Sequence, residues 1–230
     1  MPVLVFGEGV GMIGGDHKDT CVRATTPTRS PVGLDILYLR TLNWWDLLRF
    51  SLTGHIPTNS TINSAILTLH TTAVVVPGNQ TLSIARLVTP WGITPTNEGV
   101  GDSAPAIAGE ATFRRSFDFN GAGGDVAWAA GNFSAADYGA AIDTTTLNLN
   151  DPVGTVLTFN ITTGVAADVL NDVTNCGYTI YNDDPNLTQL ASQENLVVGR
   201  RPYLTIDYTI PSTGTTRQSH TAISNTIAIM

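Results

Sequence analysis

The stretch INSAILTLHTT, residues 62–72, decides the fold class. From Ala65 to Leu69 every second side chain is apolar or small, and the positions between them include Ile66 and Thr68. A second stretch, DLLRFSL at residues 46–52, alternates in the same way. A period of two residues is typical of β-strands that bury one face and leave the other in a wetter environment. These two stretches predict a β-sheet protein.

Shorter strand candidates lie on either side of these two stretches, separated by turn-forming Gly, Pro and Asn. They cover residues 19–24, 35–40, 81–88, 156–161, 177–181 and 202–208. Thr162 or Thr163 can cap one short helix that runs to Leu170, with Val165 and Val169 on one face. Strands do not alternate with helices, so the sequence predicts an all-β, jelly-roll β-sandwich of two antiparallel sheets with one short helix.

The remaining segments are arranged around this sandwich, which we expect to span residues 19–210. Residues 1–18 are apolar and then glycine-rich, and they predict an extended N-terminal arm. Residues 211–230 are polar and turn-rich, and they predict an extended C-terminal tail. Residues 89–152 are rich in Gly, Ala and Asn, and they predict an elaborated insertion that projects from the sandwich. Short strands are expected in this insertion near residues 111–119 and 126–129.

The composition excludes several classes of partner. Only 13% of the 230 residues are charged, and the formal net charge is −8. Eleven Lys and Arg residues spread along the chain do not make the basic stripe that nucleic acid requires. No apolar run approaches the roughly eighteen residues of a membrane span, and residues 1–10 do not resemble a secretory leader. The chain is then a cytoplasmic product, a protein whose leader is missing from this sequence, or a viral protein that leaves the cell by lysis. Of these we expect the last, with a place on the surface of a virion or another extracellular particle.

Several segments, taken in order, resemble the DNRLRE domain family. Its signature strand, turn and second strand resemble LLRFSL at residues 47–52, IP at 56–57 and STINSAILTL at 60–69. Later motifs of the family resemble FNIT at residues 159–162, NCGY at 175–178, SQE at 192–194 and RPYL at 201–204. The opening strand pair of the family resembles the segment that contains Asp19, Pro31, Gly33 and Leu37. The ordered matches cover residues 19–208, which is most of the chain.

This resemblance implies a jelly-roll sandwich and two kinds of function. DNRLRE domains occur as modules of secreted polysaccharide-acting proteins, where some relatives form carbohydrate-binding module family 96. They also occur as free-standing phage virion proteins. The usual Asp of two family motifs is replaced here by Ser51 and Asn160, and the usual Arg of another by Gln193. These departures weaken any inherited ligand or ion site but leave the expected fold unchanged.

The sequence favours a protein without catalytic residues. Residues 9–14 spell G-x-G-x-x-G, but no helical pattern follows that could receive a pyrophosphate, so a flexible arm is favoured over a cofactor loop. No G-x-S-x-G nucleophile elbow is present, and the four histidines lie in separate segments. Glycoside hydrolysis needs two carboxylates across a cleft, and Glu98, Asp102, Glu110 and Glu194 are available, but the sequence does not show which two of them, if any, lie close together.

No cofactor and no metal are expected. Asp143, Asp151, Asp183 and Asp184 could hold a structural calcium ion, but their spacing is unlike that of an EF-hand. Solvated turn acids are the favoured interpretation, with an Asx-type turn at residues 182–186.

The two cysteines, Cys21 and Cys176, each lie in a strand-like run. Buried free thiols are favoured over a disulfide. We also expect a structural ion pair in which Glu194 contacts Arg49 or Arg201, because a partly buried arginine needs a partner.

The four tryptophans Trp44, Trp45, Trp91 and Trp128 are the candidate residues for binding a carbohydrate or a protein partner. Indole rings stack on sugar faces and are also frequent energetic centres of protein interfaces. Trp44 and Trp45 are adjacent on one strand, so they point to opposite faces and at most one of them is free. Packing in the core competes with a binding role for all four.

The leading functional hypothesis is a non-enzymatic structural or adhesive protein of a phage virion or another assembled particle, on the decoration, head or tail surface. Residues 1–18 and 211–230 would contact copies of the chain or other particle proteins, and surface polysaccharide is a further candidate partner. The alternative is a carbohydrate-binding module of a secreted polysaccharide-acting protein. This alternative predicts a surface groove with a solvent-facing indole.

Overall fold

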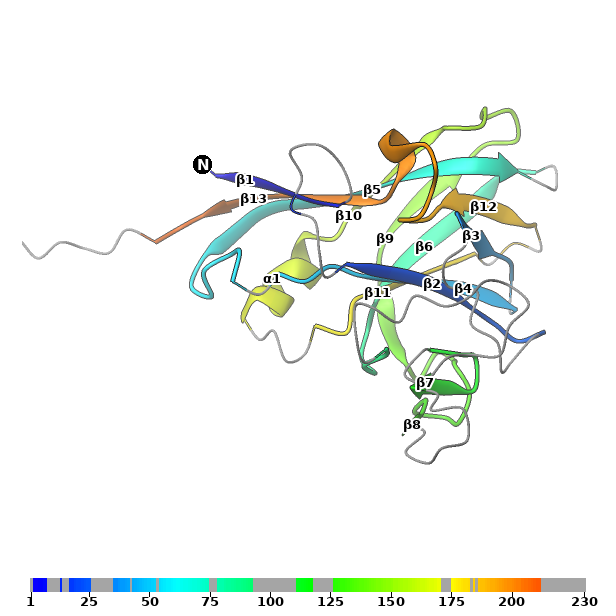
Figure 1. Cartoon of the computed structure of the whole chain (residues 1–230), viewed down its shortest axis with the longest axis horizontal. Helices are drawn as coiled ribbons and strands as arrows, with labels where there is room; N and C mark the ends of the chain where they lie inside the picture. Colours follow the sequence, from blue (N-terminus) through cyan, green and yellow to red (C-terminus); the bar gives the residue numbers. More distant parts are fainter. Residues whose placement is uncertain are drawn as a thin grey trace, which may run out of the picture.

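The computed structural model describes most of the chain, and the described residues form two antiparallel β-sheets packed face to face with one α-helix (Figure 1). The described residues are 2–7, 13, 17–25, 35–41, 43–52, 54–74, 78–92, 111–117, 126–170, 175–182, 184 and 186–211. The prediction of an all-β sandwich of two antiparallel sheets with one short helix is confirmed.

Each sheet has its own set of strands. Sheet 1 contains β1 (Val3–Gly7), β13 (Tyr203–Thr209), β5 (Thr61–Val74), β12 (Thr188–Ala191), β3 (Ile36–Leu39) and β10 (Val156–Asn160). Sheet 2 contains, in spatial order, β2 (Lys18–Arg23), β4 (Trp44–Arg49), β11 (Tyr178–Asn182), β6 (Gln80–Leu87) and β9 (Tyr138–Leu147). A separate two-stranded ribbon pairs β7 (Arg115–Phe117) with β8 (Val126–Ala127).

The connectivity is that of a jelly roll. The chain changes sheets at every step from β3 to β6, runs from β6 to its neighbour β9, and changes sheets again at every step from β9 to β12. The strands of these two runs lie in the orders β3-β12-β5-β10 and β4-β11-β6-β9. Two interlocked Greek keys of this kind define the jelly-roll architecture. β1, β2 and β13 extend the two sheets.

β5 confirms the alternation that decided the fold class. Ala65, Leu67 and Leu69 are fully buried in the main core. The same part of β5 pairs with β10 through residues 66–70 and with β13 through residues 61–68, so these two strands flank it on opposite edges. A strand with neighbours on both edges has its backbone groups hydrogen-bonded throughout, which fixes its register.

The helix α1 (Thr162–Leu170) closes one end of the main core. Val165 and Val169 are buried there, as their spacing of four residues predicts. The core between the sheets is otherwise built from alternate residues of the strands, including Leu48, Leu82, Ile84, Leu157, Phe159, Leu204 and Ile206. Burial of a side chain of this size contributes roughly 1.5–3 kcal/mol.

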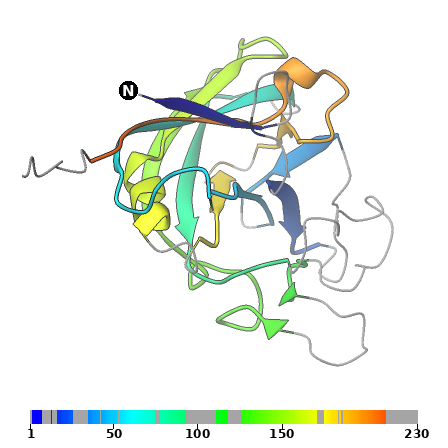
Figure 2. The ribbon, with the colours of Figure 1, turned by 60° about the vertical axis from the view of Figure 1, so that its left-hand side comes forward.

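A second hydrophobic core lies on the other face of sheet 2. Val22, Leu47 and Leu87 point away from the main core and pack against Trp128 and Phe133 of the insertion. The ribbon of β7 and β8 lies beside this face, at the bottom of Figure 1 and in Figure 2. The described part of the insertion therefore packs on part of the outer face of sheet 2 through Trp128 and Phe133, while the ribbon of β7 and β8 extends away from the two sheets.

The limits of the insertion also differ from the prediction. β7 and β8 fall near the two short strands expected at residues 111–119 and 126–129. β9, however, lies within residues 89–152 and is a regular edge strand of sheet 2 that pairs with β6. The insertion therefore ends before Tyr138.

The first strand corrects part of the expected N-terminal arm. Residues 3–7 form β1, which pairs with β13 from Val3–Asp207 to Gly7–Tyr203, and Phe6 is buried in the main core. Residues 3–7 therefore belong to the sandwich, while most of residues 8–16 and all of 212–230 lie outside the described residues. Within the described chain, no helix is long and apolar enough to cross a membrane.

Candidate functional site

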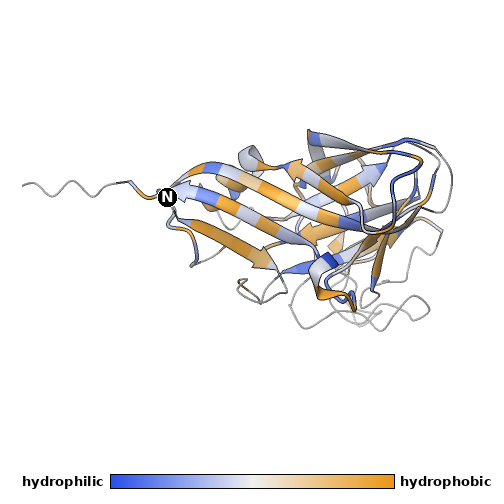
Figure 3. Cartoon of the chain, turned by 90° about the horizontal axis from the view of Figure 1, so that it is seen from above, coloured by the Kyte–Doolittle hydropathy of each residue, from blue (hydrophilic) through white to orange (hydrophobic). Residues whose placement is uncertain are grey.

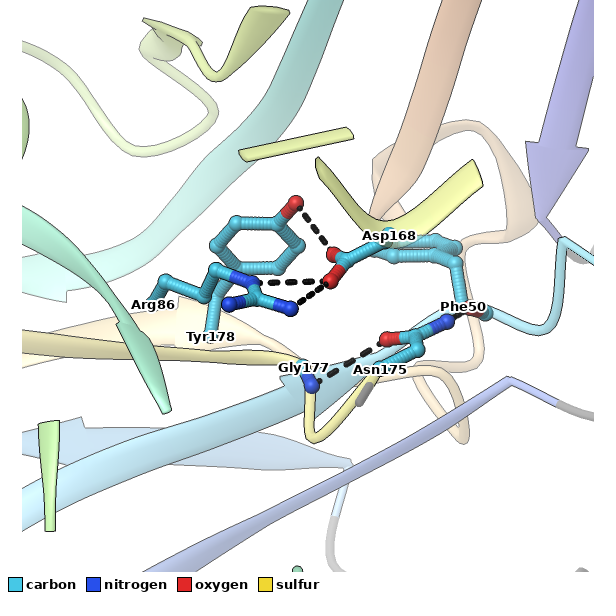
Figure 4. Close-up of polar contacts among 6 residues, drawn as sticks. All are labelled: Phe50, Arg86, Asp168, Asn175, Gly177 and Tyr178. Atoms are coloured by element: carbon cyan, nitrogen blue, oxygen red, sulfur yellow. Dashed lines mark hydrogen bonds and ion pairs between the residues drawn. The ribbon is translucent and has the colours of Figure 1, made fainter. Parts of the chain in front are cut away.

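A buried ion pair links the helix to sheet 2. Arg86 of β6 donates two hydrogen bonds to Oδ1 of Asp168, from Nε at 2.8 Å and from Nη2 at 2.5 Å. The hydroxyl of Tyr178 on β11 donates to Asp168 Oδ2 at 3.0 Å. Figure 4 shows the carboxylate between these two partners. Each oxygen of Asp168, which is only 1% exposed, thus has a donor.

This network holds the helix in position against sheet 2. Burial, and then the nearby Asp168 carboxylate, raise the pKa of Tyr178 well above 10, so the phenol stays a neutral donor. Gly164 lets the helix approach the ring, because a Cβ at this residue would lie 2.8 Å from Tyr178 atoms. Sequence analysis missed the network. The available signal was an acid at residue 168 on the buried face of the helix, between Val165 and Val169.

A second buried contact fixes the start of β11 beside this network (Figure 4). Asn175 donates from Nδ2 to the Phe50 carbonyl at 2.9 Å and accepts the Gly177 N–H at 3.2 Å. Gly177 has φ of 83°, and a Cβ there would lie 2.2 Å from the Leu48 carbonyl oxygen. Only glycine fits this position.

Trp91 and Trp128 are core residues of the second core, which corrects their assignment as candidate binding residues. Trp91 is 4% exposed, and its Nε1 donates to the Cys176 carbonyl at 2.8 Å. Trp128 is 2% exposed, and its Nε1 donates to the Thr112 carbonyl at 2.7 Å. A buried indole that also satisfies its N–H within the fold presents no ring to a ligand at the surface.

Trp44 and Trp45 lie on opposite faces of β4, as predicted, and each ring contacts other side chains. Trp45 stacks on Phe113 of the insertion with ring centroids 5.8 Å apart. Trp44 lies edge-on to Tyr38 at 5.3 Å, and the Arg23 guanidinium is 4.4 Å from its ring centroid. Both indoles are partly exposed. Trp44 is the better candidate for a binding residue, because Trp45 faces the second core.

The ion pair expected between Glu194 and Arg49 or Arg201 stays a prediction. Arg49 is the last residue of β4 and pairs with Lys18 of β2. Glu194 lies in the turn after β12. Arg201 donates from Nε to the Asn195 carbonyl at 2.9 Å.

Both cysteines are buried free thiols, as predicted. Burial raises the pKa of Cys21 to about 12 and also raises that of Cys176. Neither thiol is therefore a nucleophile at neutral pH in the folded protein.

The acids named as calcium candidates bind backbone amides. Asp151 accepts the Asn148 N–H at 2.7 Å, and Asp184 accepts the Thr81 N–H at 3.0 Å. The Asx-type turn predicted for this segment is formed by Asn182, which accepts the Asp184 N–H at 2.7 Å. Asp183, Glu98, Asp102 and Glu110 lie outside the described residues. In the described part of the chain, no three His, Cys, Asp or Glu side chains gather as metal ligands.

A rigid loop at the end of β12 exposes three aliphatic side chains in a row. Leu196, Val197 and Val198 are 87%, 52% and 49% exposed. Asn195 holds the loop in place, because its Nδ2 donates to the Asp35 carbonyl at 2.8 Å and its Oδ1 accepts the Val197 N–H at 3.0 Å. The short 3-10 helix η2 (Val198–Arg200) follows. We call residues 196–198 the aliphatic loop.

A polar hollow of about 270 Å³ lies between β9 and the start of the helix. It is lined by Ile142, Asp143, Asn160, Thr162 and Thr163. Asp143 accepts the Asn160 N–H at 2.7 Å, and Asn160 Oδ1 accepts the Thr162 N–H at 3.2 Å and its hydroxyl at 2.6 Å. These contacts fix the polar side chains before any ligand binds. Sequence analysis considered Asp143 only as a calcium ligand.

No protein-family model matches the chain, and no curated protein matches it.

Proposed function

We propose that the protein is a non-enzymatic structural or adhesive component of an assembled particle, such as the decoration, head or tail surface of a phage virion. The observation that carries this proposal is the aliphatic loop. Leu196, Val197 and Val198 are exposed on a loop whose conformation Asn195 fixes. Exposed apolar groups on a preorganised backbone cost little entropy on binding and are typical of protein contacts.

Two further points support this proposal. The described acids that were candidate calcium ligands hold backbone amides, as Asp143, Asp151 and Asp184 show. The resemblance to DNRLRE domains also includes free-standing virion proteins. In this role the sandwich supplies a rigid body, and residues 8–16 and 212–230 are further candidate contacts with copies of the chain or other particle proteins.

Particle fractionation tests the proposal. Particles from the producing culture are banded on a density gradient, and the chain is quantified across it by mass spectrometry. We expect it in the particle band, and recovery only among free proteins at the top would refute the proposal. Leu196→Asp should reduce incorporation into particles, because it places a charge in an apolar contact. Val126→Asp is the matched control, since Val126 is 46% exposed on the ribbon, away from the loop.

A second candidate function, glycan binding, is favoured by the polar hollow. Fixed carboxylate, amide and hydroxyl groups beside one aliphatic side chain suit a neutral sugar, whose hydroxyls both donate and accept hydrogen bonds. This function also fits the alternative of a carbohydrate-binding module. A glycan array followed by calorimetry tests it. Binding that Thr163→Trp abolishes by filling the hollow supports it, and binding that survives this change, or no binding to any neutral glycan, contradicts it.

A further inference from the structure

The outer face of sheet 1 carries rows of outward side chains, some of which are apolar. Figure 3 shows the strands from above, coloured by hydropathy. The strand register arranges its outward side chains in rows that cross β1, β13, β5 and β10. These rows contain Val3, Asp207 and Ser64; then Val5, Thr205, Ile66 and Asn160; then Tyr203, Thr68 and Thr158; and last His70 and Val156.

The two sheets differ in how their outer faces are covered. On sheet 2 the insertion covers part of the outer face, where Leu47 and Leu87 are fully buried in the second core. On sheet 1 Val3 is 57% and Val156 is 56% exposed, and Ile66 is only partly buried. Thr68 and His70, farther along β5, are buried. An open sheet face with this many apolar side chains is a candidate protein contact.

Opposite charges lie at the two ends of this face. Arg200 and Arg201 precede β13, and the Arg200 guanidinium packs against Gly154, with Nη2 3.4 Å from the position that a Cβ would occupy there. Asp207 lies toward the other end of the same strand, in the row of Val3. At about 3.3 Å per residue, six residues separate Arg201 from Asp207 by roughly 20 Å.

We propose that this face binds the same face of a second copy, about a two-fold axis that lies in the plane of the contact and crosses the strands near Leu204, midway between Arg201 and Asp207. This rotation reverses the strand direction, so Asp207 of each copy approaches Arg200 and Arg201 of the other. The face is therefore complementary to itself, which is the requirement for a two-fold dimer. A second copy explains both the apolar rows and the placement of the charges.

The size of the face sets the expected affinity. Four strands at about 4.8 Å spacing and six residues of about 3.3 Å each give a footprint of roughly 400 Å². This is below the roughly 800 Å² per partner of a stable complex, so we expect a weak dimer that forms only at high protein concentration. The contact goes beyond the proposed function, because it is a property of the isolated protein whatever particle it belongs to.

Sedimentation velocity over a concentration series tests the dimer. Arg200→Glu and Asp207→Arg should each weaken dimerisation about tenfold, and the variant with both changes should recover it, because the exchanged charges attract again. Melting curves establish that each variant is folded, and Val126→Asp is the control that should leave dimerisation unchanged. A wild-type chain that stays monomeric at millimolar concentration overturns the proposal, as does a charge exchange that fails to restore the dimer.

A cross-linking experiment tests the position of the axis without changing any charge. Thr205→Cys places two thiols close to the axis, on sheets that stack about 10 Å apart, so a bismaleimide with a span of about 10 Å should give a covalent dimer. The native Cys21 and Cys176 are buried and do not compete. Val126→Cys, on the ribbon, should stay monomeric with the same reagent. Equal cross-linking of both variants would contradict the proposed contact. Particle fractionation tests the proposed function, and sedimentation and cross-linking test the dimer. A negative result for the proposed function therefore leaves the dimer undecided, and a negative result for the dimer leaves the proposed function undecided.

Discussion

Removal of the Asp168 carboxylate should destabilise the fold through the partners it leaves behind. Asp168→Ala deprives the buried Tyr178 hydroxyl of its acceptor, and an unsatisfied buried donor costs about 1–3 kcal/mol. Arg86 also loses its counter-charge, but its side chain is 26% exposed and can turn toward water, so its share is nearer 1 kcal/mol. The sum is about 3 kcal/mol, or roughly 6–12 °C in melting temperature for a domain of this size.

Urea denaturation of four proteins measures this expectation. Tyr178→Phe leaves Asp168 Oδ2 buried without this donor, so it should also cost about 2 kcal/mol. The double variant Asp168→Ala/Tyr178→Phe should cost about 2 kcal/mol less than the sum of the single changes, because neither the hydroxyl nor the carboxylate oxygen is left unsatisfied. If the costs of the two single changes add fully in the double variant, or if Asp168→Ala is as stable as the wild type, the network does not contribute to the stability of the fold.

Three other changes have defined outcomes. Gly177→Ala should lower the free energy of unfolding by about 3 kcal/mol or more, because the added Cβ meets backbone atoms. Gly54 has a similar φ of 75° but lies in open space, so Gly54→Ala should cost only about 1 kcal/mol. Urea denaturation of the two variants compares these costs. The raised pKa values of Cys21 and Tyr178 mean that the folded state holds these protons more tightly than the unfolded state, so stability should fall as the pH rises above about 9–10, and Cys21→Ala should reduce that fall. Burial raises the pKa of Asp46 well above its usual range, so its ionisation costs stability as the pH rises above about 4; Asp46→Asn should melt higher than the wild type at pH 7 but not at pH 3.

Strands with an apolar inner face could be predicted from the sequence. β10 alternates cleanly because one of its faces borders the main core, and its period of two residues survives as a burial pattern. In β5 the burial alternates from Ala65 to Leu67, but Thr68 and His70 are buried as well as Leu69. The helix was equally visible, since Val165 and Val169 are four residues apart. In each case a single neighbouring layer decides which side chains are buried, so the local sequence pattern is enough to predict the buried face.

Edge strands and long-range polar contacts could not be predicted in the same way. β9 is exposed along most of its length, so its sequence needs no apolar alternation, and its place is fixed by hydrogen bonds to β6, about 60 residues earlier. β1 depends in the same way on β13, from the other end of the chain. The partners of Asp168 come from β6 and β11, and no sequence spacing indicates that these strands meet below the helix.

The tryptophans show which kind of information is missing. Alternation along β4 correctly places Trp44 and Trp45 on opposite faces, but it does not say whether the outward face of a sheet stays open. On sheet 2 the insertion closes that face, and Trp91 and Trp128 become core residues instead of a binding platform. On sheet 1 Val3, Ile66 and Val156 keep part of their exposure, although Thr68 and His70 are buried. The aliphatic loop and the polar hollow both lie at the borders of that sheet. Because sheet 2 uses part of its outer face for the second core, we expect partners to bind around sheet 1.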